Sequence, residues 1–228
     1  MTMSGRLGTV LGLFVVAVGL IIWVLMGLLT PGTPEGVVNF VGSSAAGQPV
    51  NMTIQTVGSI GFGNHPTWVS YLVKTPQGKW IQDTTWQLPA NTQVNVTVLQ
   101  YDSGSPLRNQ QWGQVTGTAG GHATLNGAPY STYNSYGGNG VGHTFTVPSL
   151  GLSVPLVGVN GNLSLCGVAP CSLKQPHNTI TFSFKTPAKS GEYHWQCFVP
   201  CGLGYLYGNG GPMSTYGYMG GFLDVVQQ

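Results

Sequence analysis

The sequence predicts an all-β fold, a sandwich or barrel of short strands, preceded by a single membrane-spanning α-helix. Three observations support this prediction. They are an uncharged apolar run near the N-terminus, several later stretches of alternating apolar and polar residues, and 36 glycines and 15 prolines that supply turns. Hydrophobic residues make up 42% of the 228-residue chain, which excludes an intrinsically disordered protein.

The N-terminal helix is predicted over residues 7–29, which contain no charged residue. About 20 apolar residues suffice to cross a bilayer as a helix. A secretory signal has a shorter apolar core and a small-residue cleavage site, so we interpret residues 1–30 as an uncleaved anchor. Arg6 is the only charged side chain before the run. The positive-inside rule therefore predicts a single-pass protein of the cell membrane, with a cytoplasmic N-terminus and residues 31–228 as an extracytoplasmic domain.

Alternating apolar and polar residues predict the strands of that domain. The alternation is strict over residues 93–98 and 179–184, and residues 143–147 form a third clear strand. No stretch after the anchor has a convincing helical period. The remaining strand predictions cover residues 50–57, 67–73 and the closing segment 222–226.

Two stretches of the domain lack strand periodicity. Residues 103–141 are rich in Gly, Ser, Asn and Tyr, and we interpret them as a long surface excursion between strands. Residues 202–221 form a loop rich in Gly and Tyr. A loop of that length inside a compact domain is usually functional or lies on another surface.

Charge is sparse, because 7 basic and 5 acidic residues make up only 5% of the chain and give a net charge of +2. So few cations exclude a phosphate-binding surface, and nucleic acid is not an expected partner. No carboxylate pair or nucleophile–base pair is evident, so we expect neither a small-molecule substrate nor a catalytic activity of its own. A partner that docks by charge complementarity finds little to contact. We expect other subunits of a membrane complex to cover part of this neutral surface.

The four cysteines form two close pairs in the last third of the chain. In an oxidising compartment such pairs are disulfides or metal ligands. Cys166 and Cys171 enclose a short, turn-rich segment without histidine, which predicts a structural disulfide. The second pair, Cys197 and Cys201, lies between the last two predicted strands.

Two further soft donors accompany this second pair. His143 begins a predicted strand, and Met219 follows the glycine-rich loop. In a β-sandwich these positions can meet the two cysteines at one end of the fold. Thiolate, imidazole and thioether ligands together suit copper that cycles between two oxidation states.

These segments resemble subunit II of cytochrome c oxidase, in its copper-A domain. The resemblance is carried by residues 142–158 with His143, by residues 187–202 with the pattern Gln-Cys-x3-Cys-Gly, and by residues 219–226, which begin with a methionine. Residues 86–102 are similar to a strand before the first histidine. The resemblance covers about residues 80–226, with insertions at about 103–141 and 159–176. It implies a cupredoxin-like Greek-key β-sandwich.

The resemblance also implies a ligand set. The family's site is a dinuclear copper centre, so Cys197 and Cys201 would be the bridging thiolates. His143 would be the first histidine ligand and Val199 the donor of a backbone carbonyl. Met219 is the expected thioether if the longer loop before it is accepted, with Met213 as a weaker substitute. The family has a second histidine three residues after the second cysteine, a position that Tyr205 occupies here.

The other histidines are not expected to replace the missing one. His194 lies three residues before Cys197, so on a strand it points to the opposite face. We expect solvated or hydrogen-bonded side chains at the remaining positions, His65, His122 and His177.

Three alternatives remain for this site. In the first, one copper ion is bound by His143, Cys197 or Cys201, and Met219, which is favoured because one histidine alone is credible. In the second, a dinuclear centre survives with an unusual further donor. In the third, Cys197 and Cys201 form a disulfide in a copper-free structural or docking subunit. The predicted function is therefore copper-dependent electron transfer by a membrane-anchored subunit of a respiratory or other membrane oxidase complex.

Overall fold

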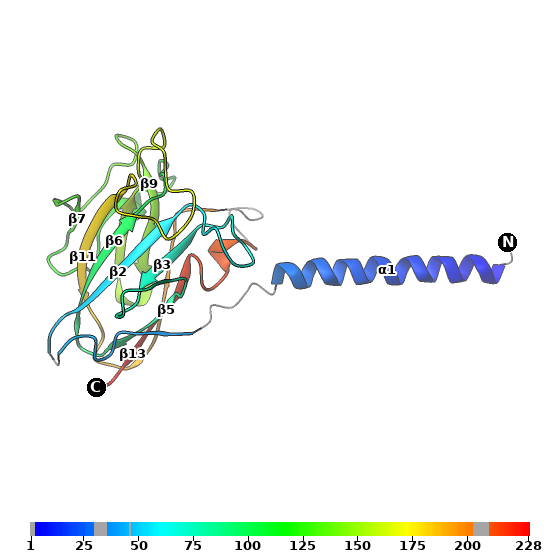
Figure 1. The fold of residues 1–228 in the computed structure, drawn as a ribbon, viewed down its shortest axis with the longest axis horizontal. Coiled ribbons are helices and arrows are strands. Elements are labelled where there is room, and N and C mark those ends of the chain that lie inside the picture. Colours follow the sequence, from blue (N-terminus) through cyan, green and yellow to red (C-terminus); the bar gives the residue numbers. More distant parts are fainter. Residues whose placement is uncertain (1–2, 30–35, 46, 203–209) are drawn as a thin grey trace. The chain divides into compact units, whose positions relative to one another are not determined.

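The computed structural model describes residues 3–29, 36–45, 47–202 and 210–228, and in the first of these ranges the side chains of Gly8 and residues 10–26. The chain divides into two compact units, residues 1–33 and residues 34–228. Figure 1 shows one helix in the first unit and a β-sandwich in the second. The predicted fold class is confirmed in its architecture: the domain is an all-β sandwich of two sheets, and one α-helix precedes it in the chain.

The first unit is a single helix, α1 (Met3–Leu29), which covers the residues predicted as an anchor. Nearly all of its described apolar side chains, among them Val10, Phe14 and Trp23, are exposed. Within the residues that the structure describes, no helix is both long enough and apolar enough to cross a membrane.

The second unit consists of two sheets (Figure 1). The first sheet contains, in spatial order, β1 (Val38–Asn39), β5 (Thr85–Pro89), β13 (Gly220–Val226), β12 (Gly191–Gln196), β9 (Val141–Val147) and β10 (Leu152–Val157). The second sheet contains β4 (Trp80–Ile81), β3 (Ser70–Lys74), β2 (Val50–Val57), β6 (Gln93–Gln100), β11 (Asn178–Lys185), β7 (Ala123–Leu125) and β8 (Ala128–Tyr130). Most neighbours are antiparallel, but β1 with β5, β5 with β13 and β2 with β6 are parallel.

Aromatic side chains fill the space between the sheets. The rings of Trp86 on β5 and Trp195 on β12 stack with their centroids 4.8 Å apart, and Phe145 on β9 lies 5.5 Å from Trp195. Both indole N–H groups donate to main-chain carbonyls, at Asp83 and Thr84. Buried aromatic rings contribute strongly to core energetics, and an indole is tolerated in a core when its N–H has a partner. This cluster therefore fixes β5, β9 and β12 against one another.

The six predicted strands are confirmed as β2, β3, β6, β9, β11 and β13. Their boundaries shift by a few residues. β3 begins at Ser70 rather than at Thr67, because the preceding residues form a turn in which the Trp68 N–H donates to the His65 carbonyl.

The segment 103–141 is more regular than predicted. It contains the hairpin β7–β8, which extends the second sheet next to β11. The two strands are joined by Asn126-Gly127, and both of these residues have positive φ, at 51° and 87°. An Asn-Gly pair is the preferred sequence of a two-residue hairpin turn. The expectation of an excursion without strands was therefore wrong over residues 123–130.

Strand β10 was not identified from periodicity, because Pro155 lies in its middle. A proline cannot donate to a strand ladder, so it is confined mainly to edge strands. β10 is the edge strand of the first sheet, next to β9 alone. The Tyr130 hydroxyl donates to the Pro155 carbonyl at 2.6 Å and covers this edge.

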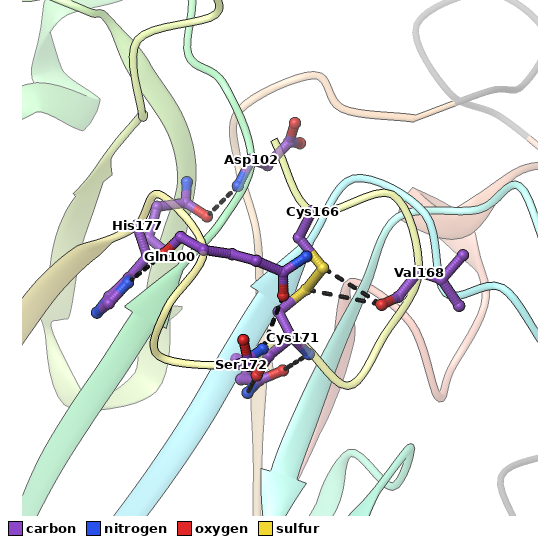
Figure 2. Close-up of a disulfide and its surroundings, with 9 residues drawn as sticks. Gln100, Asp102, Cys166, Val168, Cys171, Ser172 and His177 are labelled. Carbon is purple, nitrogen blue, oxygen red and sulfur yellow. Dashed lines mark hydrogen bonds between the residues drawn. A yellow bond between two sulfur atoms is a disulfide. The ribbon is translucent and has the colours of Figure 1, made fainter. Parts of the chain in front are cut away.

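The predicted disulfide between Cys166 and Cys171 is confirmed. Figure 2 shows the bridge with the Val168 carbonyl beside it. The Gln55 side chain on β2 binds the main chain of Cys171 twice, donating to its carbonyl at 2.8 Å and accepting from its N–H at 2.9 Å. The insertion at residues 159–176 is thereby fastened to the second sheet, on the side away from the aromatic core, where the bridge packs against Val57, Leu72, Leu99 and Tyr101.

Candidate metal centre

Three of the predicted ligands meet at one end of the sandwich. His143 lies on β9, Cys197 directly follows β12, and Cys201 lies in the next loop. The Cys197 Sγ is 4.0 Å from the His143 Nδ1 and 3.6 Å from the Cys201 Sγ. The three ligand atoms all lie within 4.8 Å of one another. β9 and β12 are neighbours in the first sheet, so strand alternation carries His143 and Cys197 to the same interior face as Phe145 and Trp195.

The imidazole of His143 is oriented from behind by a carboxylate. Its Nε2 lies 3.1 Å from the Asp102 Oδ2, which leaves Nδ1 facing the sulfurs. His143 is completely buried. Burial lowers its pKa, but the hydrogen bonds with Asp102 and Cys197 outweigh this effect and raise the pKa to about 9. A carboxylate that binds the remote nitrogen of a histidine fixes its tautomer and ring orientation, as is common behind metal-binding histidines.

The Asp102 carboxylate is itself held in place. It follows β6 and accepts a hydrogen bond from the Ser103 N–H at 2.8 Å. Burial raises the pKa of Asp102, but the hydrogen bond with His143 and the His143 charge lower it by more. The pKa therefore falls below its usual value, and the carboxylate stays ionised. The two side chains come from different sheets and join them at the site.

The two cysteines differ in protonation. Burial raises the pKa of Cys197, but hydrogen bonds from Cys201 and His143 and the His143 charge bring it well below the usual range. The hydrogen bond to Cys197 and burial raise the pKa of Cys201 well above it. The Thr144 N–H also donates to the Cys197 Sγ at 3.4 Å. Cys197 is therefore the thiolate of the pair, and the thiolate is the form that binds metals.

A thioether reaches the pair from the loop after Cys201. The Met213 Sδ, in a short 3-10 helix (Pro212–Ser214), lies 3.1 Å from the Cys201 Sγ. Met219, the methionine favoured by the sequence, is buried and forms main-chain contacts. Its carbonyl accepts from the Cys197 N–H at 2.8 Å, and its N–H donates to the Pro212 carbonyl. The thioether in contact with a cysteine of the site is thus that of Met213, the weaker of the two candidates in the sequence.

A main-chain oxygen also faces the cluster. The Val199 carbonyl lies 3.4 Å from the Cys197 Sγ, in the place where the sequence suggested a carbonyl ligand.

Tyr205, predicted to occupy the position of a second histidine, lies outside the described residues. Tyr71 on β3 was not predicted: it is buried, its hydroxyl donates to the Thr144 carbonyl at 2.9 Å, and its ring lies 6.1 Å from that of His143.

The remaining histidines occupy other environments. The His194 ring contacts Tyr216 and Phe222 on the outer face of β12. The other three are each engaged in a ring contact or a main-chain hydrogen bond: His65 stacks on Trp68, His122 lies against the Gly120 carbonyl, and His177 against the Gln175 carbonyl.

Neither a protein-family model nor a curated protein matches the chain. Among solved structures, the chain is similar to rusticyanin from Thiobacillus ferrooxidans, at 16% identity over 85% of this chain and 86% of that chain, with a TM-score of 0.33. It is also similar to reduced rusticyanin, at 17% identity over 85% and 90% of the two chains, with a TM-score of 0.32. Similarity at this level carries no information about ligands or activity.

If Asp102 orients the His143 imidazole toward a metal, Asp102→Asn should weaken copper binding by about tenfold or more, the usual cost of losing such a partner. The protein should remain folded. Competition with a copper chelator measures the affinity, and circular dichroism checks the fold.

Asp224→Asn is the matched control, because Asp224 is also a partly buried carboxylate that accepts a hydrogen bond, from Gln87, but in the body of the first sheet. Equal copper affinity of the Asp102 variant and the wild type would contradict the orienting role.

Proposed function

We propose that the domain binds copper through His143, Cys197 and Cys201 and transfers single electrons. The observation that carries this proposal is the convergence of a buried imidazole and two sulfurs within 4.8 Å, with a third sulfur beside them. Thiolates and imidazole bind both zinc and copper, and the thioether beside them favours copper, because methionine is not among the usual zinc ligands.

The donor set fits copper better than it fits a hard cation. A site of hard cations such as calcium or magnesium is built from oxygen ligands, whereas this cluster presents sulfur and nitrogen. When bound, copper would supply a one-electron change of oxidation state. His143 would offer Nδ1, the two cysteines would offer their sulfurs, and Met213 and the Val199 carbonyl lie beside those sulfurs.

We propose a single copper ion rather than a pair. Within the described part of the chain, His143 is the one histidine in the cluster with the two cysteines. The role of the chain residues is to hold a fixed geometry. Asp102 orients the imidazole, Thr144 donates to the Cys197 sulfur, and the Trp195 core excludes water, which together limit rearrangement on electron transfer.

The structure also suggests a route for the electron. Phe198, covalently next to Cys197, stacks on Trp112 with ring centroids 4.5 Å apart. Both rings line a surface pocket of about 310 Å³ together with Leu107, Val199 and Pro200. We propose that the redox partner docks here mainly through apolar contacts, with Arg108 as the charged side chain of the pocket lining, because the chain as a whole offers little charge for electrostatic guidance.

The setting that we propose is a membrane oxidase complex, respiratory or other, in which the domain is one subunit among several. The support is the resemblance to oxidase subunit II and the uncharged sequence of residues 7–29, whose described apolar side chains are nearly all exposed. The full chain should then sediment with membranes and resist carbonate extraction, whereas residues 31–228 alone should not. Recovery of the full chain in the soluble fraction would contradict membrane anchoring.

The alternative, a copper-free subunit in which Cys197 and Cys201 form a disulfide, is less favoured. Both thiols are free, and each faces another donor, His143 at Cys197 and Met213 at Cys201. A structural disulfide has no need of an oriented imidazole or a thioether.

The direct test is metal analysis with an optical spectrum of protein purified without chelator. We expect stoichiometric copper and an intense visible band from charge transfer between thiolate and copper, both lost in Cys197→Ser. Thr179→Ser, on the solvated part of β11, serves as the control. Colourless, copper-free protein without free thiols would favour the structural alternative.

The proposed electron route predicts a separate effect. Trp112→Leu should leave the copper spectrum unchanged but slow electron exchange with an alkanethiol-coated gold electrode by about tenfold. Protein-film voltammetry measures this rate. Trp80→Leu is the control, because Trp80 is a partly buried tryptophan of the second sheet that packs against the apolar cluster around the Cys166–Cys171 disulfide. This variant should exchange electrons at the wild-type rate. Equal rates in all three proteins would contradict the route.

A further inference from the structure

Three asparagines of the domain lie in the pattern Asn-x-Ser/Thr without proline at the middle position, which is the acceptor pattern for N-linked glycans. They are Asn51, Asn95 and Asn162. So short a pattern also occurs by chance, and alone it does not separate acceptors that are used from those that are not. The structure separates them, because the three amide groups differ in exposure and in hydrogen bonding.

Asn51 and Asn95 are neighbours on the outer face of the second sheet. They lie on β2 and β6, which run parallel and side by side, and they are register partners (Figure 1). Val50 and Met52, on either side of Asn51, are buried, so strand alternation directs the asparagine outward. Asn51 is exposed, whereas Asn95 is half-buried.

Hydrogen bonds leave the two amide groups in different states. The Asn95 Nδ2 donates to the Asn51 Oδ1 at 3.1 Å, and the Asn95 Oδ1 accepts from the Gln93 amide at 2.9 Å. Both ends of the Asn95 amide are therefore occupied. The Asn51 Nδ2 has no hydrogen-bond partner in the described part of the chain. Because its Oδ1 faces Asn95 on β6, the Asn51 Nδ2 is directed away from that neighbour.

The side of β2 opposite β6 has room for a substituent on Asn51. A surface pocket of about 320 Å³ lies there, against β3, and its lining includes Ser43, Ser44, Asn51, Thr53 and Lys74. The polar groups of this lining are hydroxyls, an amide and an ammonium, and no carboxylate is among the described ones. A sugar attached to Asn51 would therefore meet open space and polar side chains rather than a packed neighbour.

We propose that Asn51 carries an N-linked glycan and that Asn95 does not. Asn162, exposed in the loop before the disulfide, is an acceptor by the same criterion as Asn51. The inference goes beyond the proposed function and does not depend on copper. It requires an extracytoplasmic, oxidising compartment, for which the Cys166–Cys171 disulfide is independent support. A glycan would also cover part of a face that carries few charges.

The modification is a group transfer from a lipid-linked sugar diphosphate. The anomeric carbon of the first sugar bonds to the Asn51 Nδ2 as its bond to the phosphate oxygen breaks. Nδ2 gives up one proton to a base of the transferring enzyme, and the lipid diphosphate leaves. The Asn51 Oδ1 remains a carbonyl oxygen and still accepts from Asn95. Sugars on both asparagines would stand only about 4.8 Å apart, one strand spacing, which disfavours a second glycan at Asn95.

The first experiment is peptide mass spectrometry of the full-length protein purified from its native host. We expect a sugar mass on Asn51 and none on Asn95. Thr53→Val removes the hydroxyl that the acceptor pattern requires, so occupancy of Asn51 should fall at least about tenfold, whereas Thr53→Ser should retain it. Thr97→Val is the matched control, because it makes the same change in the Asn95 pattern on the adjacent strand, and it should leave the sugar mass unchanged.

The outcomes separate this inference from the proposed function when copper is measured on the same samples. Copper-containing protein with an unmodified Asn51, a sugar on Asn95, or a sugar mass on Asn51 that survives Thr53→Val would overturn the modification and leave the proposed function intact. Copper-free protein with a sugar on Asn51 would support the modification and contradict the proposed function.

A second experiment examines the two amide groups without any transferring enzyme. Unglycosylated full-length protein in detergent micelles is studied by NMR, which measures exchange of the side-chain amide protons with water. The Asn51 protons should exchange about tenfold faster than those of Asn95, because the Asn95 Nδ2 donates to Asn51. Equal exchange rates, or slower exchange at Asn51, would overturn the assignment of Asn51 as the accessible acceptor.

Discussion

The stacking of Trp195 on Trp86, with Phe145 packed beside them, is the contact on which the position of the metal centre depends. These rings fix β12 and β9 as neighbours with their interior faces aligned. In a strand, side chains two residues apart share a face. His143 lies two residues before Phe145, and Cys197 lies two residues after Trp195. The core that stabilises the sandwich therefore also brings the imidazole and the first sulfur together.

A buried cluster of polar groups is costly unless each group has a partner. In a chain with 5% charged residues, one of the few carboxylates, Asp102, is used to pair with His143. The imidazole in turn faces the Cys197 thiolate, which also accepts from the Thr144 N–H. Each donor of the candidate site is thus satisfied by another before any metal binds, and the arrangement is preserved by mutual hydrogen bonds. A metal entering this cluster would replace contacts between donors without moving the strands that carry them.

The sequence was informative where a local pattern reports a local structure. Strict alternation identified β6 and β11, and the short segment between Cys166 and Cys171 identified the disulfide. The pattern failed at β10, where Pro155 is tolerated because the strand lies at an edge. Asn126-Gly127 was a readable hairpin signal within a segment whose composition suggested only a loop.

The candidate site was predictable to the extent that its residues lie in short motifs. His143, Cys197 and Cys201 are recognisable by spacing, but Asp102 reaches His143 from the other sheet, which no spacing reveals. The choice between Met213 and Met219 depends on the path of the loop 202–221, and loop length alone places neither sulfur. The contact of Met213 with Cys201 is made from the 3-10 helix Pro212–Ser214, which no spacing in the sequence reveals.

The central claim, that His143, Cys197 and Cys201 hold copper, is tested most directly by X-ray absorption at the copper edge of the purified full-length protein. We expect a first coordination sphere with sulfur scatterers from the two cysteines and one imidazole. We also expect loss of the imidazole signal in His143→Gln. Copper surrounded only by nitrogen and oxygen scatterers, or a spectrum unchanged in His143→Gln, would contradict this claim.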